Sequence, residues 1–173
     1  IYGPDEVRRI ASLDHEIKPG DAFRLGGTDL QVMDLGGHTL GHIGYYSAAD
    51  GAAFVGDTLF PLGCGRLFEG TPRQMWASLA RIAALPPETA LYSAHEYTLA
   101  SLKFAESLGG DEALRARGER VRRLRAEGLA TVPATVAEEL ATNPFLVWPL
   151  REQGVEAQAA KFGELRAAKD GFR

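Results

Sequence analysis

The chain has 173 residues, of which 45% are hydrophobic and 24% are charged, and its formal net charge at pH 7 is −4. A chain of this size can bury one substantial core, or a core with a small appended domain. The slightly acidic balance gives no basic footprint for nucleic acid, and no apolar run approaches the ~20 residues that a membrane span needs. The sequence therefore predicts neither a nucleic-acid partner nor a membrane partner.

The single cysteine, Cys64, excludes a disulfide within the chain and fits a reducing compartment. The first residues, Ile-Tyr-Gly-Pro, do not resemble a secretory signal, which needs a basic start followed by an apolar stretch. These features together favour a cytoplasmic protein, and we expect a monomer.

The first 97 residues are rich in predicted strands. Turn residues separate short apolar runs, and Thr71-Pro72 is typical of a helix start, with Pro86-Pro87 ending that helix. We expect a short helix over 5–12, strands over 22–25, 29–34, 42–47, 52–55 and 90–94, and a helix over 72–84.

From residue 98 onward the spacing of apolar residues becomes helical. We expect helices over 98–108, 111–127, about 134–141 and 152–167. Basic residues gather in this part, which fits either an anionic substrate or, more commonly, a solvated helix face. The predicted fold class is α/β (α+β), with a strand-rich domain over 1–97 and a helical domain over 98–173.

Three potential metal ligands follow predicted strands or lie in a glycine-rich loop. His38 lies in G-G-H-T-L-G-H, Asp57 closes the apolar run A-A-F-V-G, and His95 follows the run A-L-Y-S-A. Imidazole nitrogens and a carboxylate suit a zinc-like or iron-like ion. The alternatives are structural: a histidine after a strand is more often hydrogen-bonded in the fold, and an aspartate can hold a turn.

Other chemistries have weaker support. No serine lies in a nucleophile elbow, and Cys64 lies between glycines with no histidine near it in sequence. We expect Cys64 to be a small loop residue and His15 to be a surface histidine.

Four segments together resemble a known family. They are G-H-T-L-G-H-I-G-Y-Y, G-D-T-L-F-P-L-G-C-G-R-L-F-E-G-T, S-A-H-E-Y-T and T-N-P-F-L. In this order and spacing they are similar to the hydroxyacylglutathione hydrolases (glyoxalase II) of the metallo-β-lactamase superfamily. The resemblance covers essentially the whole chain.

The resemblance implies an αββα sandwich, of which this chain holds the C-terminal half, followed by a helical substrate domain. It also implies two divalent metal ions, usually zinc, with iron or manganese as alternatives. By position, His38, Asp57 and His95 match metal ligands, with Asp57 as the catalytic bridging ligand that positions the attacking hydroxide. His42 matches a motif histidine that is not a ligand.

The resemblance places the glutathione part of the substrate on five further positions. These substrate-binding positions are Arg66, Phe68, Tyr97, Arg166 and Lys169. Phe68 stands where the family often has tyrosine, so its expected role is packing. Arg166 and Lys169 are expected to pair with carboxylates of glutathione.

One family motif, T-H-x-H-x-D-H, has no match in this sequence. In the family it supplies four further ligands from an N-terminal segment of roughly 80 residues. The expectation is that Ile1 is not the native start, and that this chain alone is inactive.

The predicted function is hydrolysis of a thioester, S-2-hydroxyacylglutathione (for example S-lactoylglutathione), to glutathione and a 2-hydroxy acid in methylglyoxal detoxification. Two alternatives stay open. The chain could be a non-catalytic remnant that binds glutathione conjugates, or the protein could be another enzyme of the superfamily such as a persulfide dioxygenase.

Overall fold

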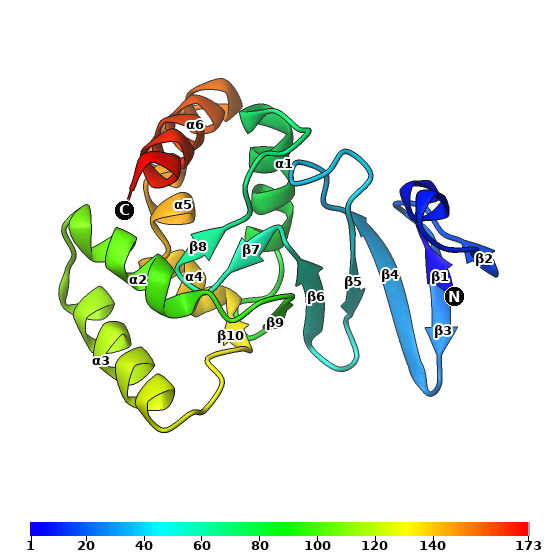
Figure 1. The fold of residues 1–173 in the computed structure, drawn as a ribbon, viewed down its shortest axis with the longest axis horizontal. Helices are drawn as coiled ribbons and strands as arrows, with labels where there is room; N and C mark the ends of the chain where they lie inside the picture. Colours follow the sequence, from blue (N-terminus) through cyan, green and yellow to red (C-terminus); the bar gives the residue numbers. More distant parts are fainter. Residues whose placement is uncertain (173) are drawn as a thin grey trace.

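The computed structural model describes residues 1–172, and a six-stranded mixed sheet forms its centre (Figure 1). The strand order is β10-β9-β6-β5-β4-β3, in which only the β6–β9 pair is parallel. Two small two-stranded sheets, β1–β2 and β7–β8, lie outside it. The strands are β1 (Tyr2–Gly3), β2 (His15–Glu16), β3 (Ala22–Leu25), β4 (Thr28–Asp34), β5 (Ile43–Ser47), β6 (Ala52–Gly56), β7 (Leu59–Phe60), β8 (Gly63–Cys64), β9 (Ala90–Ser93) and β10 (Ala134–Thr135).

Helices gather on one face of this sheet and beyond its β10 end (Figure 1). The helix α1 begins with a capping box, in which Thr71 and Gln74 satisfy each other's backbone N–H groups. The α-helices are α1 (Pro72–Ala83), α2 (Thr98–Ser107), α3 (Glu112–Ala126), α4 (Val136–Thr142), α5 (Pro144–Val147) and α6 (Val155–Gly171), and the 3-10 helices are Asp5–Arg9 and Pro149–Arg151. No helix within residues 1–172 is both long enough and apolar enough to cross a membrane.

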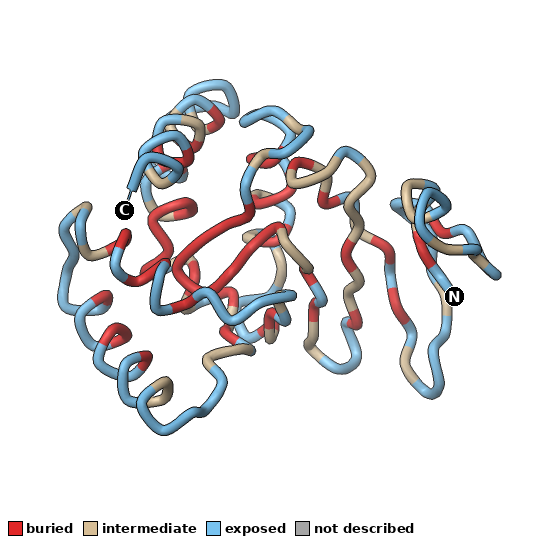
Figure 2. Tube along the Cα trace, viewed as in Figure 1, coloured by how far each residue is buried: buried red, intermediate tan, exposed pale blue. Residues whose placement is uncertain are grey.

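The main core lies between the sheet and helices α1, α4, α5 and α6 (Figure 2). From the sheet, Ala53, Val55 and Leu91 project into it. From the helices, Trp76 and Phe162 are among its largest fully buried side chains. This core combines residues from both sides of position 97, so burial of apolar surface holds the strand-rich and helical parts together.

The opposite face of the sheet carries a row of aromatic side chains. Tyr45, Phe54 and Tyr92 are neighbours across β5, β6 and β9, and the rings of Phe54 and Tyr92 stack with centroids 5.2 Å apart. Phe54 is 44% exposed and Tyr92 is 38% exposed. This part of the sheet is therefore covered on one face only.

The structure confirms most of the predicted elements and shows what the sequence pattern missed. The strand over 52–55 and the helices over 98–108 and 111–127 match β6, α2 and α3 to within one or two residues. The hairpin β7–β8 was not predicted, because its strands are only two residues long and Leu62 in its turn adopts a positive φ of 62°. The segment 134–141 begins as the edge strand β10 before it becomes helix α4.

The arginines of α3 pair with glutamates of neighbouring elements. Arg120 pairs with Glu138 of α4, and Arg122 pairs with Glu106 of α2. None of these four residues lines the pocket described below. For these arginines of α3, the structure therefore favours the solvated helix face, with ion pairs to neighbouring helices, over contact with an anionic substrate.

A buried polar network joins the β7–β8 hairpin to α3 and α4. Arg117 is 6% exposed and donates to Glu139, which is 1% exposed. Glu139 also accepts from the backbone N–H of Leu62 at 2.9 Å and from the amide of Asn143 at 2.8 Å. The Asn143 amide in turn donates to the carbonyl of Gly63 at 3.0 Å. This network explains why an asparagine precedes Pro-Phe-Leu in the sequence.

Candidate active site

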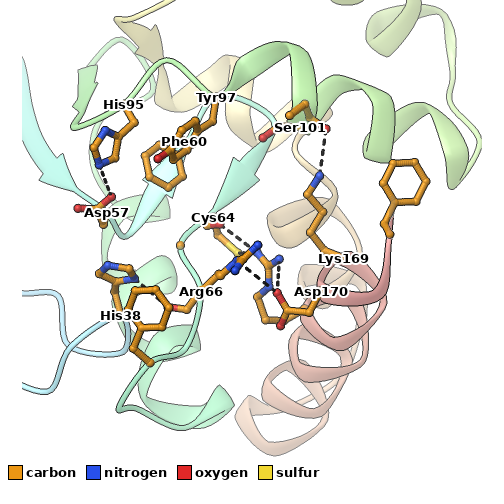
Figure 3. Close-up of a pocket in the computed structure, with 15 residues that line it drawn as sticks. His38, Asp57, Phe60, Cys64, Arg66, His95, Tyr97, Ser101, Lys169 and Asp170 are labelled. Atoms are coloured by element: carbon orange, nitrogen blue, oxygen red, sulfur yellow. Dashed lines mark hydrogen bonds and ion pairs between the residues drawn. The ribbon is translucent and has the colours of Figure 1, made fainter.

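A pocket of about 500 Å³ opens between the end of β6, the β8 loop, α2 and the C-terminal end of α6 (Figure 3). This volume is typical of a small-molecule site. Its main lining residues are His38, Asp57, Phe60, Cys64, Gly65, Arg66, Phe68, His95, Tyr97, Ser101, Arg166, Lys169, Asp170 and Phe172. All eight site residues predicted from the sequence are among them. We call His38, Asp57 and His95 the donor wall, and Cys64, Arg66, Arg166, Lys169 and Asp170 the substrate wall.

Asp57 follows β6 directly and lies between His95 and His38 in the pocket (Figure 3). Its backbone N–H donates to Nε2 of His42 at 3.2 Å, and Nδ1 of His42 lies 3.4 Å from the hydroxyl of Thr58. Burial lowers the pKa of His42, and the Asp57 carboxylate offsets only part of this effect. His42 is therefore neutral near pH 7 and supports the turn behind Asp57 with both ring nitrogens.

His95 reaches Asp57 from the end of β9. Its Nε2 lies 3.3 Å from Oδ1 of Asp57, and its ring stacks on Tyr97 with centroids 4.9 Å apart. The residue between them, Glu96, accepts hydrogen bonds from the backbone N–H and the hydroxyl of Thr131 at 2.8 and 2.7 Å. These bonds tie the His95–Tyr97 turn to the segment that precedes β10.

His38 approaches from the loop after β4. Its Nδ1 lies 2.9 Å from the carbonyl oxygen of Arg66, so Nδ1 carries the hydrogen and Nε2 keeps a free lone pair. Metal-binding histidines typically have this arrangement, in which the second nitrogen donates to a carbonyl. The Phe68 ring lies 4.7 Å from the His38 ring, centroid to centroid, which agrees with the packing role expected for Phe68.

Gly65 brings the two sides of the donor wall together. A Cβ atom at this position would lie 1.9 Å from the carbonyl oxygen of Asp57 and 3.3 Å from Nδ1 of His38. Only glycine lets the β8 loop pass this close to Asp57 and His38. The second glycine of the G-C-G motif is therefore required because no side chain fits at this position.

The donor wall fits a divalent metal by chemistry, but it is not a complete cluster. Two imidazoles and one carboxylate are suitable ligands, and the His38 tautomer leaves a nitrogen free to coordinate. Within residues 1–172, however, no three His, Cys, Asp or Glu side chains are close enough together to hold an ion. Three donors would also be few for two ions, since a catalytic zinc usually has three protein ligands of its own.

The substrate wall contains three cationic side chains and one anionic side chain. These side chains differ in solvent exposure and in the hydrogen bonds that they already make. The Arg66 side chain is 70% exposed, and Lys169 donates to the carbonyl of Ala100 at 3.0 Å. Burial, and then the charge of Arg166, lowers the pKa of Lys169. Arg166 is only 5% exposed, and it donates to the carbonyl of Cys64 at 3.0 Å. Arg166 therefore holds β8 against α6, whereas Arg66 and Lys169 are the more accessible cations.

Cys64 lines the same wall, and its thiol is free but buried. Burial raises the pKa of its thiol to about 11, although Arg166 acts in the opposite direction. A thiol that stays protonated at neutral pH is a poor nucleophile. The expectation that Cys64 is not a nucleophile agrees with this burial, but the expectation of a loop residue was wrong, because Cys64 lies in the two-residue strand β8.

Three of the lining residues to which the sequence analysis assigned no role shape this pocket. Phe60 lies in the unpredicted β7 and packs against Tyr97 with ring centroids 5.2 Å apart. No role was predicted from the sequence for Gly65, nor for Asp170, which directly follows Lys169. An acidic residue beside two expected anion-binding residues was the available signal for Asp170.

Comparison with known proteins agrees with this geometry. Residues 3–95 match the family model of the metallo-β-lactamase superfamily, and residues 96–172 match that of the hydroxyacylglutathione hydrolase C-terminus. The hydroxyacylglutathione hydrolase of Methylococcus capsulatus is 49% identical over 95% of this chain and 67% of its own length. The hydroxyacylglutathione hydrolase of Hyphomonas neptunium is 46% identical over 99% of this chain and 70% of its own length. The chain thus spans about two thirds of the length of these relatives.

Solved structures support the fold. The crystal structure of ETHE1 from Myxococcus xanthus covers 99% of this chain and 56% of its own length, with a TM-score of 0.62 and 23% sequence identity. That of the BLEG-1 B3 metallo-β-lactamase covers 84% of this chain and 64% of its own length, with a TM-score of 0.58 and 21% identity. At these identities the likeness concerns the fold alone. With the sequence matches and the pocket taken together, the chain belongs to the hydroxyacylglutathione hydrolases, the thioester hydrolases of the metallo-β-lactamase superfamily.

Proposed function

We propose that this protein hydrolyses S-2-hydroxyacylglutathione thioesters such as S-lactoylglutathione, releasing glutathione and a 2-hydroxy acid in methylglyoxal detoxification. The observation that carries the proposal is the pocket itself. One cavity of about 500 Å³ has nitrogen and carboxylate donors on one wall and accessible cations on the other. A glutathione thioester carries its thioester carbonyl on the sulfur of the central cysteine and its carboxylates on the two flanking residues, so both kinds of wall have a matching group.

The donor wall is the proposed place of the chemistry. His38, Asp57 and His95 would each supply a ligand to a site for two divalent ions, which needs further donors as well, and zinc, iron and manganese all suit these side chains. Such ions supply Lewis acidity and a nucleophile that is available at neutral pH. The protein's own part is to orient the His38 ring, through the hydrogen bond from its Nδ1 to the Arg66 carbonyl, and to fix the backbone of Asp57 through the ring of His42.

The substrate wall is the proposed place of glutathione. Arg66 and Lys169 would pair with its carboxylates, and charge-assisted hydrogen bonds of this kind orient a substrate. Tyr97 and Phe68 add aromatic surface beside the donor wall. Arg166 is already hydrogen-bonded to Cys64 and Asp170, so we assign it chiefly to holding the wall together. The proposed division therefore gives residues 1–97 the metal donors together with Arg66, Phe68 and Tyr97. Residues 98–173 contribute Lys169 to the substrate and Arg166 as its support.

A second proposal concerns the number of metal donors in this chain. Because three donors are few for two ions, we propose that this chain needs further donors for full activity. Without them it would bind the glutathione thioester and turn it over poorly. We keep a monomeric, cytoplasmic protein as part of the proposal. The sequence identity of 44–49% to proteins named hydroxyacylglutathione hydrolase favours the thioesterase over a persulfide dioxygenase.

The test is the variant Asp57→Ala of the full-length protein, because turnover is proposed to need donors beyond those of this chain. We expect zinc content and release of free thiol from S-lactoylglutathione to fall together, by about 100-fold or more in rate, because even outer partners of metal ligands cost 10- to 100-fold. The matched control is Asp29→Ala, since Asp29 is an exposed aspartate of the same sheet with only a long pairing to Arg24. Normal turnover in Asp57→Ala, or equal losses in both variants, would contradict the assignment.

A further inference from the structure

Asp170 is an acidic residue inside a pocket that is proposed to bind an anion. It lies at the C-terminal end of α6, half exposed, and it lines the cavity beside Arg66 and Lys169 (Figure 3). Its Oδ1 accepts from Nη2 of Arg166 at 2.9 Å and lies 3.9 Å from Nε of Arg66. One carboxylate thus faces two guanidinium groups of the substrate wall.

Arg166 depends on this carboxylate. The Arg166 side chain is buried, its Nη1 donates to the neutral carbonyl of Cys64, and its buried Nε has no hydrogen-bond partner among residues 1–172. A buried cation is costly unless an opposite charge compensates it. Within the described residues, Asp170 is the acidic partner with which Arg166 forms an ion pair.

The contact with Arg66 is of a different kind. At 3.9 Å, with a side chain that is 70% exposed, Arg66 is held only loosely by Asp170. Exposed pairs of this type contribute little to stability and are easily replaced by another anion. Arg66 is therefore free to exchange Asp170 for a carboxylate that enters the pocket.

We propose that Asp170 is a specificity-determining residue that acts as an internal counter-anion of the substrate wall. It neutralises part of the positive charge of Arg66, Arg166 and Lys169, and a carboxylate of the ligand must compete with it. This inference rests on the proposed function, because it concerns the same site and the same class of ligand. Its consequence is moderate affinity for glutathione, which lets the thiol product leave after hydrolysis.

The variant Asp170→Asn tests the inference, since it removes the charge and keeps an oxygen that can accept from Arg166. We expect it to bind S-lactoylglutathione about fivefold more tightly than the wild type, as one added unit of positive charge near a surface predicts. The salt dependence of binding should also become steeper. The diester of S-lactoylglutathione, in which both carboxylates are blocked, should bind both proteins equally. Isothermal titration calorimetry on the full chain measures all of these affinities without requiring turnover.

The matched control is Glu164→Gln on the same helix, because Glu164 is exposed, pairs with Lys161 and does not line the pocket. It should leave both affinities unchanged. Unchanged or weaker binding of S-lactoylglutathione to Asp170→Asn, with normal binding to the wild type, would overturn this inference alone. Absence of binding to the wild type would instead overturn the proposed function.

Folding of the variant gives a second readout. Loss of the Asp170 charge leaves Arg166 less compensated, so Asp170→Asn should melt at a lower temperature than the wild type, and the thioester should restore more of the loss than the diester. If the variant is unfolded alone, refolding by the thioester but not by the diester supports the inference. Refolding by neither compound overturns it.

Discussion

The two walls of the pocket are held in place by different means. The substrate wall is supported from behind by buried charges, because Glu139 receives hydrogen bonds from Arg117, Asn143 and the backbone of Leu62. The donor wall is held by backbone contacts and by single hydrogen bonds to ring nitrogens, as at His42. The side chain of His95 is 49% exposed, so solvent reaches this wall as well.

This difference shows how the fold separates binding from chemistry. The supports of the substrate wall join residues far apart in sequence, such as Leu62 and Glu139, so they require the complete helical packing. The donor wall uses short loops after strands, where small shifts of the backbone move the ligands directly. We therefore expect changes behind the substrate wall to affect stability most, and changes at the donor wall to affect metal binding most.

The largest effect is expected for Glu139→Gln. Removing this charge leaves Arg117 buried without a counter-ion, which typically costs about 3–5 kcal/mol. The matched control is Glu106→Gln, since Glu106 pairs with an arginine of the same helix, Arg122, near the surface. The control should cost less than about 1 kcal/mol. Urea denaturation measures both, and equal losses would show that the substrate wall does not depend on the buried pair.

A smaller effect on stability, but a larger one on metal binding, is expected for Gly65→Ala. The new methyl group would collide with the Asp57 carbonyl, and relief of such overpacking costs about 1–3 kcal/mol. Because the backbone of Asp57 must move, the zinc content should also fall. Gly27→Ala is the control, since a Cβ atom there meets nothing within 4 Å. Unchanged zinc content in Gly65→Ala would mean that the donor wall tolerates movement of the loop.

The smallest effect concerns His42 and pH. Because burial lowers the pKa of His42 in the folded state, the unfolded chain takes up a proton first as the pH falls. The resulting contribution to stability is complete above the unfolded pKa of about 6.5, and it declines as the pH falls from there toward the lowered pKa. Denaturation midpoints at about pH 7.5 and about pH 5.5 should therefore differ less in His42→Asn than in the wild type. As a control, His15→Asn should show the same difference between the two midpoints as the wild type. If His42→Asn also shows the wild-type difference, His42 is not the source of this pH dependence.

The sequence predicted the parts of the molecule that depend on local patterns. Asp57 and His95 could be found because each follows an apolar strand, and α1 because Thr71 and Pro72 mark its start. Gly65 and Asp170 could not be assigned a role in this way. Their importance comes from close approach and ion pairing with residues that the chain brings together only on folding.

The same reason explains why the sequence left two interpretations of the basic residues after residue 98, an anionic substrate or a solvated helix face. The number of arginines in α3 indicates positive charge, but it does not show which acidic residues pair with them. Glu106 and Glu138 lie on different helices, and their pairing with Arg122 and Arg120 follows from helix packing alone. The family resemblance predicted that Arg166 binds a carboxylate of the substrate, and the structure shows its hydrogen bonds to Cys64 and Asp170.

The edge strand β10 makes the helical part inseparable from the sheet. The chain leaves the sheet after β9, forms α2 and α3, and returns to pair Ala134 with Leu91 of that same strand. A recombinant exchange of everything after residue 97 would therefore replace a strand of the sheet together with the helices. The helical part therefore contributes one strand to the sheet. A chimera that takes its helical part from a relative will need a β10 strand that pairs correctly with β9.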